Sequence, residues 1–87
     1  TFGNNTFVAV GGSGNIVRST DNGSSWDNVT SPTSRGLMAV GFGNNTFVVV
    51  GINFLSSPPP ILRSTDNGSS WDNVTSPTSN ALYGVTF

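Results

Sequence analysis

Few side chains in this sequence can support acid–base, nucleophilic or metal chemistry. The 87 residues include four acidic and three basic residues, one Tyr, and neither His nor Cys. All the acidic residues are Asp and all the basic ones Arg, so most of the usual catalytic side chains are missing. The remaining groups are concentrated in one phrase, RSTDNGSSW, which occurs with the same letters at residues 18–26 and 63–71. This phrase is therefore the strongest candidate for chemistry in the chain.

The residue types of the phrase are also those of a tight turn between two strands. Asp21 can accept hydrogen bonds from main-chain N–H groups just ahead of it, and Ser19 can add a hydroxyl bond. Gly23 can take the positive φ that a side chain resists, and Trp26 can fold back to cover the turn. The same roles recur in the second copy at Ser64, Asp66, Gly68 and Trp71. We interpret the phrase as structural.

Metal binding by the phrase is not expected. The segment Asp21-Asn22-Gly23 superficially resembles a calcium loop, but the alternating Asp or Asn residues and the terminal Glu of such a loop are missing. We therefore predict no metal, no cofactor and no catalytic residue.

The phrase belongs to a longer internal repeat. FGNNTFV occurs at residues 2–8 and 42–48, an offset of 40, whereas RSTDNGSSWDNVTSPTS occurs at residues 18–34 and 63–79, an offset of 45. Five residues are therefore inserted between these two blocks in the second copy. The 17 consecutive identical residues are also compatible with an engineered or reconstructed sequence.

Strand and turn signals divide each repeat into short segments. With 11 Gly and 5 Pro in the chain, no window shows the 3.6-residue period of a helix. In the second repeat, turn residues separate runs rich in β-branched and aromatic side chains at residues 37–42, 46–50, 61–64 and 71–75. We predict an all-β fold.

Four antiparallel strands in each unit of 40 to 45 residues is the signature of a β-propeller blade. Residues 19–26 and 64–71 both match S-x-D-x-G-x-x-W, the pattern of the Asp box, also called the bacterial neuraminidase repeat. The whole chain resembles the propeller blades of the photosystem II assembly-factor type. This resemblance implies two four-stranded blades, with each Asp box in a structural role on an outer hairpin.

Sialidases share the Asp box, and their catalysis uses an arginine cluster, a tyrosine nucleophile with a glutamate partner, and an aspartate acid/base. This chain has no Glu, and its one Tyr, Tyr83, corresponds to Met38 in the first copy, which favours packing over catalysis. Arg18 and Arg63 fit solvated strand positions better than a clamp for a carboxylate. We predict that the chain is not an enzyme.

The repeat is cut in the middle of a motif, because Thr86-Phe87 repeats Thr1-Phe2. With strands lettered A to D outward from a propeller channel, residues 1–41 supply B, C, D and the start of the next A. Residues 42–87 supply the second repeat and a terminal A strand. We predict that this strand pairs with the first repeat of another copy. The assembly strand comprises Leu82, Tyr83, Val85 and Phe87.

Strand exchange of this kind predicts a homo-oligomer. A propeller needs several blades, so chains of two blades close only into even-numbered rings. We expect a trimer or a tetramer if the rotation closes, and a filament if it does not. The same sequence is also compatible with a part of a longer tandem array on one polypeptide.

The insertion in the second repeat is the main difference between the two units. It suggests an alternative function, a propeller scaffold that binds a glycan or a protein on the face carrying the insertion. On that face, Phe54 and Leu55 beside the stiff proline segment would form an exposed apolar ridge. The candidate binding residues are Phe54, Leu55, Pro58, Pro59 and Pro60.

Charge and composition narrow the partners further. The formal net charge of −1 gives no basic face for nucleic acid, and no apolar run is long enough to span a membrane. Six N-x-S/T sequons occur, of which Asn28 and Asn73 are the best candidates for glycosylation. Few charges with many Ser, Thr, Asn and Gly suggest an extracellular or cell-surface protein.

Overall fold

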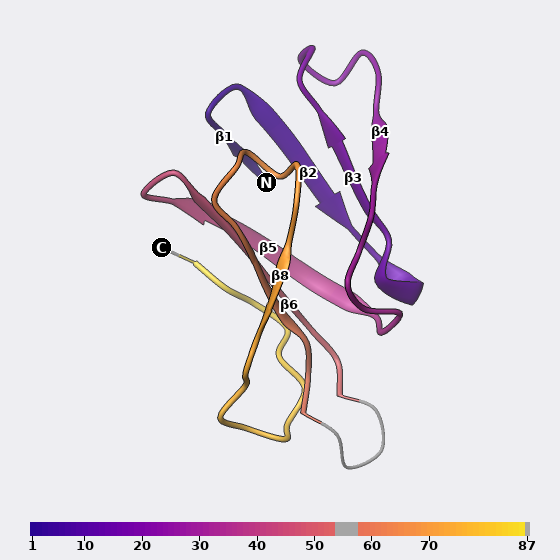
Figure 1. Ribbon diagram of the computed structural model, residues 1–87, viewed down its shortest axis with the longest axis vertical. Helices are drawn as coiled ribbons and strands as arrows, with labels where there is room; N and C mark the ends of the chain where they lie inside the picture. The colour runs from indigo at the N-terminus through magenta and orange to yellow at the C-terminus, as the bar shows by residue number, and fades with distance from the viewer. Residues whose placement is uncertain (54–57, 87) are drawn as a thin grey trace.

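The fold consists of two four-stranded antiparallel sheets, seen one above the other in Figure 1. The computed structural model describes residues 1–53 and 58–86. In these ranges it has eight strands and one short 3-10 segment, η1 (Gly12–Gly14). The all-β class predicted from the strand and turn signals is confirmed. In the described ranges, no helix is long and apolar enough to cross a membrane.

Sheet A is formed by the first repeat, and each strand pairs with the next one along the chain. Its strands are β1 (Phe2–Gly3), β2 (Thr6–Val10), β3 (Ile16–Ser19) and β4 (Asp27–Val29).

Sheet B has the same order and is formed mainly by the second repeat. Its strands are β5 (Leu37–Gly43), β6 (Thr46–Gly51), β7 (Ile61–Ser64) and β8 (Asp72–Val74). Strand β5 spans the boundary drawn between residues 41 and 42.

The two repeats form the same hairpins. Phe7 pairs with Ser19 in sheet A as Phe47 pairs with Ser64 in sheet B. The turn between the first two strands has two Asn residues at positive φ in each sheet, with φ of 54° and 61° at Asn4 and Asn5. Such residues suit the two-residue turns that match the twist of a hairpin.

The first strands of the two sheets differ in length. Strand β5 has seven residues and pairs along the whole of β6, whereas β1 has two residues and pairs only with Thr6 and Phe7. Towards its C-terminal end, β2 therefore has no β1 partner beside Ala9 and Val10.

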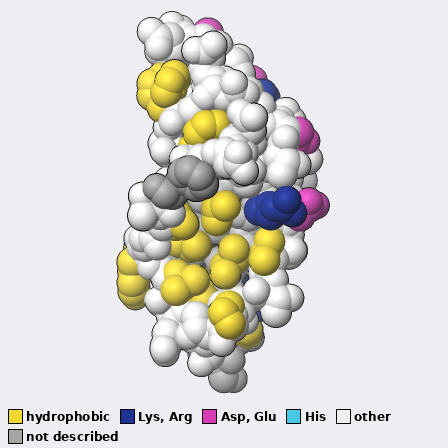
Figure 2. Space-filling view, turned by 90° about the vertical axis from the view of Figure 1, so that its left-hand side faces the viewer, with side chains coloured by type: hydrophobic (Ala, Val, Ile, Leu, Met, Phe, Trp, Pro, Cys, Tyr) yellow, Lys and Arg dark blue, Asp and Glu magenta, His cyan; other side chains and the backbone are white. Residues whose placement is uncertain are grey.

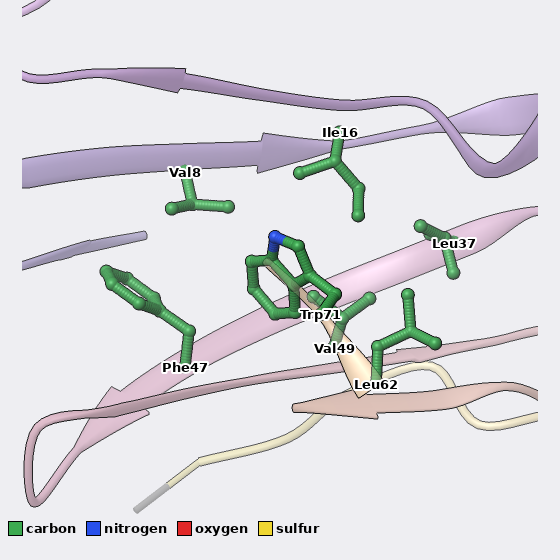
Figure 3. Packing of buried hydrophobic residues seen from close by; sticks show 7 residues of the cluster. All are labelled: Val8, Ile16, Leu37, Phe47, Val49, Leu62 and Trp71. Atoms are coloured by element: carbon green, nitrogen blue, oxygen red, sulfur yellow. The ribbon is translucent and has the colours of Figure 1, made fainter. Parts of the chain in front are cut away.

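The core lies between one face of sheet A and one face of sheet B (Figure 3). Since side chains alternate along a strand, each sheet turns only one set of residues inward. Sheet A contributes Val8 and Ile16, each 1% exposed. Sheet B contributes Leu37, Phe47, Val49, Leu62 and Trp71.

Candidate functional site

The repeated phrase forms a closed network of hydrogen bonds in the turn between β3 and β4. The Ser19 hydroxyl donates to Oδ1 of Asp21 at 2.8 Å and accepts the Gly23 N–H at 2.9 Å. Asp21 also accepts the Ser25 N–H at 2.9 Å and the Ser25 hydroxyl. Gly23 has a φ of +88°, and its carbonyl oxygen accepts the Trp26 indole N–H at 3.1 Å. The polar groups that stood out in the sequence therefore bind one another.

The turn between β7 and β8 has the same geometry. Ser64 donates to Asp66 at 2.8 Å and accepts the Gly68 N–H at 2.9 Å. Asp66 accepts the Ser70 N–H at 2.9 Å, and the Trp71 indole N–H donates to Gly68 at 3.0 Å. Two identical stretches of sequence have thus folded into the same local structure.

These hydrogen bonds lower the pKa of both turn carboxylates. The Ser70 hydroxyl, then the Ser70 N–H and the Ser64 hydroxyl, lower the pKa of Asp66 from 3.8 to about 2. The Ser25 hydroxyl, the Ser25 N–H and the Ser19 hydroxyl do the same for Asp21, whose pKa is also about 2. A carboxylate that remains ionised at neutral pH cannot serve as a general acid there. The geometry suits a structural role, in which each carboxylate stabilises its turn.

Acid should destabilise the chain through these two carboxylates. Their pKa in the folded chain is about 2, below the value of 3.8 for the free group. Their stabilising contribution is therefore complete above about pH 4 and is lost as the pH falls towards 2. We expect the melting temperature, followed by circular dichroism, to fall over this range. The double variant Asp21→Asn, Asp66→Asn should flatten that dependence, whereas the control Asp27→Asn, Asp72→Asn should retain it.

The two Trp residues of the phrase have the same turn but different surroundings. Trp71 is 7% exposed, whereas Trp26 is 45% exposed. Each packs on the Phe of its own sheet, with ring centroids 6.3 Å apart for both Phe47–Trp71 and Phe7–Trp26. The difference therefore comes from what lies over the sheet: sheet A covers Trp71, and among the residues described no second sheet covers Trp26.

The same contrast holds for whole faces of the sheets. Sheet A packs on sheet B through the face of Thr6, Val8 and Ile16, leaving its other face open; we call this second face the open face of sheet A. It carries Phe2, which is 50% exposed, and Trp26. The open face of sheet B, the one turned away from sheet A, carries Thr46, Val48, Ile61 and Arg63, and also Val50, which is 5% exposed.

The open face of sheet B has a groove. A hollow of about 250 Å³ lies between the hairpin of β5 and β6 and the C-terminal segment, residues 82–86. It is lined by Gly41, Phe42, Val48, Val85 and neighbouring residues. Figure 2 shows hydrophobic side chains gathered on the half of the molecule formed by sheet B and this segment.

Residues 82–86 adopt no strand within the part of the chain described, but they are not free of the fold. The Leu82 N–H donates to the Gly51 carbonyl oxygen at 2.9 Å, and the Leu37 N–H donates to that of Gly11 at 3.0 Å. Leu37 and Leu82 are equivalent in the repeat, as are Gly11 and Gly51. The segment therefore meets sheet B as the start of β5 meets sheet A. Tyr83 is exposed and Val85 half-buried; Phe87 lies outside the described residues.

The insertion gives little support to a binding ridge. Phe54 and Leu55 lie outside the described residues, and of the three prolines only Pro58 is exposed, because Pro59 and Pro60 are buried. The Pro58 carbonyl oxygen accepts a hydrogen bond from Nη1 of Arg35.

The two candidate glycosylation residues lie on the last strand of each sheet. Asn28 in β4 and Asn73 in β8 are both exposed.

Sequence reasoning missed a residue that joins the two sheets by several hydrogen bonds. Asn67, in the turn between β7 and β8, hydrogen-bonds to Thr6, Arg18 and Asn4 of sheet A. The Asp-box pattern leaves this position open, and an Asn before Gly signals a turn without saying what the turn contacts. Only the packing of the sheets identifies it.

The residues described include no group of three or more side chains that could hold a metal ion. The described chain thus offers two braced turns, two open sheet faces and a groove. Comparison of the chain with protein-family models, with curated proteins and with solved structures finds no match.

Proposed function

We propose that this chain is a non-catalytic assembly module whose copies stack sheet on sheet into a propeller ring or an open array. One observation carries the proposal: a Trp in an identical turn is 7% exposed in sheet B and 45% exposed in sheet A. Large exposed apolar groups on one contiguous face are typical of interaction surfaces. A surface that fits the exposed Trp26 is already present, because within the chain the equivalent surface of sheet A covers Trp71.

The two open faces are complementary by repetition. The open face of sheet A carries the same kinds of residue as the face that sheet B buries, with Phe7 and Trp26 in place of Phe47 and Trp71. The open face of sheet B carries Thr46 and Val48, the equivalents of the buried Thr6 and Val8. A second copy can therefore repeat the contact between the two sheets with its sheet A on the sheet B of the first. Such a contact joins two different surfaces, so it propagates.

The C-terminal segment supports the same arrangement. Residues 82–85 correspond to residues 37–40, the part of β5 for which sheet A has no equivalent strand beside Ala9 and Val10. The hydrogen bond from Leu82 to Gly51 holds this segment as the first strand of a following sheet would be held. In the assembly, β2 of the next copy pairs with it beside Ala9 and Val10, so that strand addition extends the short first strand of that copy's sheet A. An unpaired apolar edge is otherwise an aggregation hazard.

Solution mass tests the proposal. We expect light scattering to give three or four times the chain mass of 9.0 kDa, about 27 or 36 kDa, for closed rings. Six or eight sheets would then make one propeller, and a polydisperse high mass would indicate an open array. A stable 9.0 kDa species up to millimolar concentration would contradict self-assembly and favour a tandem array on one polypeptide.

The alternative, a glycan- or protein-binding scaffold using the insertion, stays a prediction. Of its five residues, Pro59 and Pro60 are buried and Pro58 is exposed, and Phe54 and Leu55 lie outside the described ranges.

A further inference from the structure

Asn67 ties the two sheets together at the tip of the turn between β7 and β8. Its Nδ2 donates to Oγ1 of Thr6 at 2.7 Å, and its Oδ1 accepts from Nδ2 of Asn4 at 3.3 Å. Its carbonyl oxygen accepts from Nε of Arg18 at 3.1 Å. We call these three hydrogen bonds the clasp.

The clasp is part-buried at Thr6 and Arg18 and closely fitted there, whereas its hydrogen bond to Asn4 is exposed. Thr6 is 1% exposed, and a Cβ on Gly68 would lie 3.4 Å from Val8 and 3.6 Å from Arg18. The Thr6 hydroxyl donates to the Asn4 carbonyl oxygen, so it meets Asn67 as an acceptor. Because hydrogen bonds have directional requirements, the clasp selects one orientation of sheet B on sheet A, which apolar packing alone does not do.

Each half of the clasp recurs on an open face without its counterpart. Asn22 occupies the position of Asn67 and has nearly the same φ, 64° against 65°. It is exposed, and a Cβ on the adjacent Gly23 would meet nothing within 4 Å, in contrast to Gly68. The turn is therefore held in the clasp conformation by its own hydrogen bonds before any partner is present.

The receiving half is equally prepared on sheet B. Thr46 donates its hydroxyl to the Asn44 carbonyl oxygen at 3.2 Å, as Thr6 does to Asn4, which leaves the Thr46 oxygen free to act as an acceptor. Arg63 and Asn44, the equivalents of Arg18 and Asn4, are both exposed. These groups lie on the open face of sheet B.

We infer that Asn22 of one copy clasps Thr46, Arg63 and Asn44 of the next copy. This inference rests on the proposed assembly and deepens it, because it names the polar contact that fixes the direction of stacking. The open face of sheet A then meets the open face of sheet B and never a second copy of itself. Growth in one direction is what allows a ring to close.

A double-mutant cycle tests the clasp. Asn22→Gly keeps the positive φ and the carbonyl oxygen and removes only the side chain, and Thr46→Val removes only the hydroxyl. The dissociation constant of the assembly, measured by sedimentation on dilution, should rise about tenfold for each variant. The double variant should be little weaker than either single one, because both remove the same bond. The matched control, Asn67→Gly, should lower the melting temperature of the chain itself, whereas Asn22→Gly should not.

The outcomes separate the two proposals. If the unmodified chain assembles and Asn22→Gly and Thr46→Val leave the dissociation constant unchanged, or their effects simply add, the clasp is overturned and the assembly proposal stands. If the unmodified chain remains monomeric over the whole concentration range, the assembly proposal fails and the clasp fails with it.

Discussion

Replacing Trp71 with Ala should lower the free energy of unfolding by about 3–5 kcal/mol, whereas replacing Trp26 with Ala should lower it by less than about 1 kcal/mol. The two residues have the same neighbours in sequence and the same indole hydrogen bond. They differ in cover, because Trp71 is 7% exposed between the sheets and Trp26 is 45% exposed. Removing a buried Trp loses its transfer free energy and leaves a cavity, whereas at an exposed site water fills the space.

Urea unfolding followed by circular dichroism, below the concentration at which copies associate, measures both changes. Each variant serves as the control for the other, since the local turn is lost or kept equally in both. Equal destabilisation would show that the turn, and not the contact between sheets, sets the contribution of Trp. At concentrations at which copies associate, the order of the two variants should reverse: Trp26→Ala should weaken self-association more than Trp71→Ala does.

In a second pair of equivalent residues, substitution by Ala should lower the free energy of unfolding at Gly51 and leave it almost unchanged at Gly11. A Cβ on Gly51 would lie 2.2 Å from the Gly36 carbonyl oxygen and 3.1 Å from Cα of Leu37. Main-chain atoms cannot rotate aside, so Gly51→Ala must shift β5 against β6 and should cost about 3 kcal/mol. A Cβ on Gly11 would meet nothing within 4 Å, so Gly11→Ala should change the free energy of unfolding by less than about 0.5 kcal/mol.

Gly11→Ala, although tolerated within one chain, should prevent assembly. In the proposed ring, Ala81 and Leu82 of another copy approach Gly11 as Gly36 and Leu37 approach Gly51, so the added methyl group would block strand addition. We expect Gly11→Ala to fold normally and to remain at the chain mass of 9.0 kDa by light scattering. Normal assembly of this variant would rule out pairing of the C-terminal segment with β2.

The sequence by itself determined the local structure. Alternating apolar residues and Asn-rich turns predicted the four strands of the second repeat to within about two residues, because strand pairing within a hairpin depends on neighbours in the chain. The two-residue strand β1 was not predicted. The repeated phrase likewise predicted the two turns, whose hydrogen bonds join residues no more than four apart in sequence.

What only the tertiary structure decided is which copy of each repeated residue is covered. Identical segments have identical propensities, so no sequence pattern distinguishes Trp26 from Trp71 or Asn22 from Asn67. The distinction arises because a sheet has two faces, and two stacked sheets cover only one face of each. The contacts that cover the packed faces join residues 49 to 63 positions apart, as in the hydrogen bonds of Asn67 to Arg18, Thr6 and Asn4. Contacts over such separations follow from how the sheets stack and not from local residue preferences.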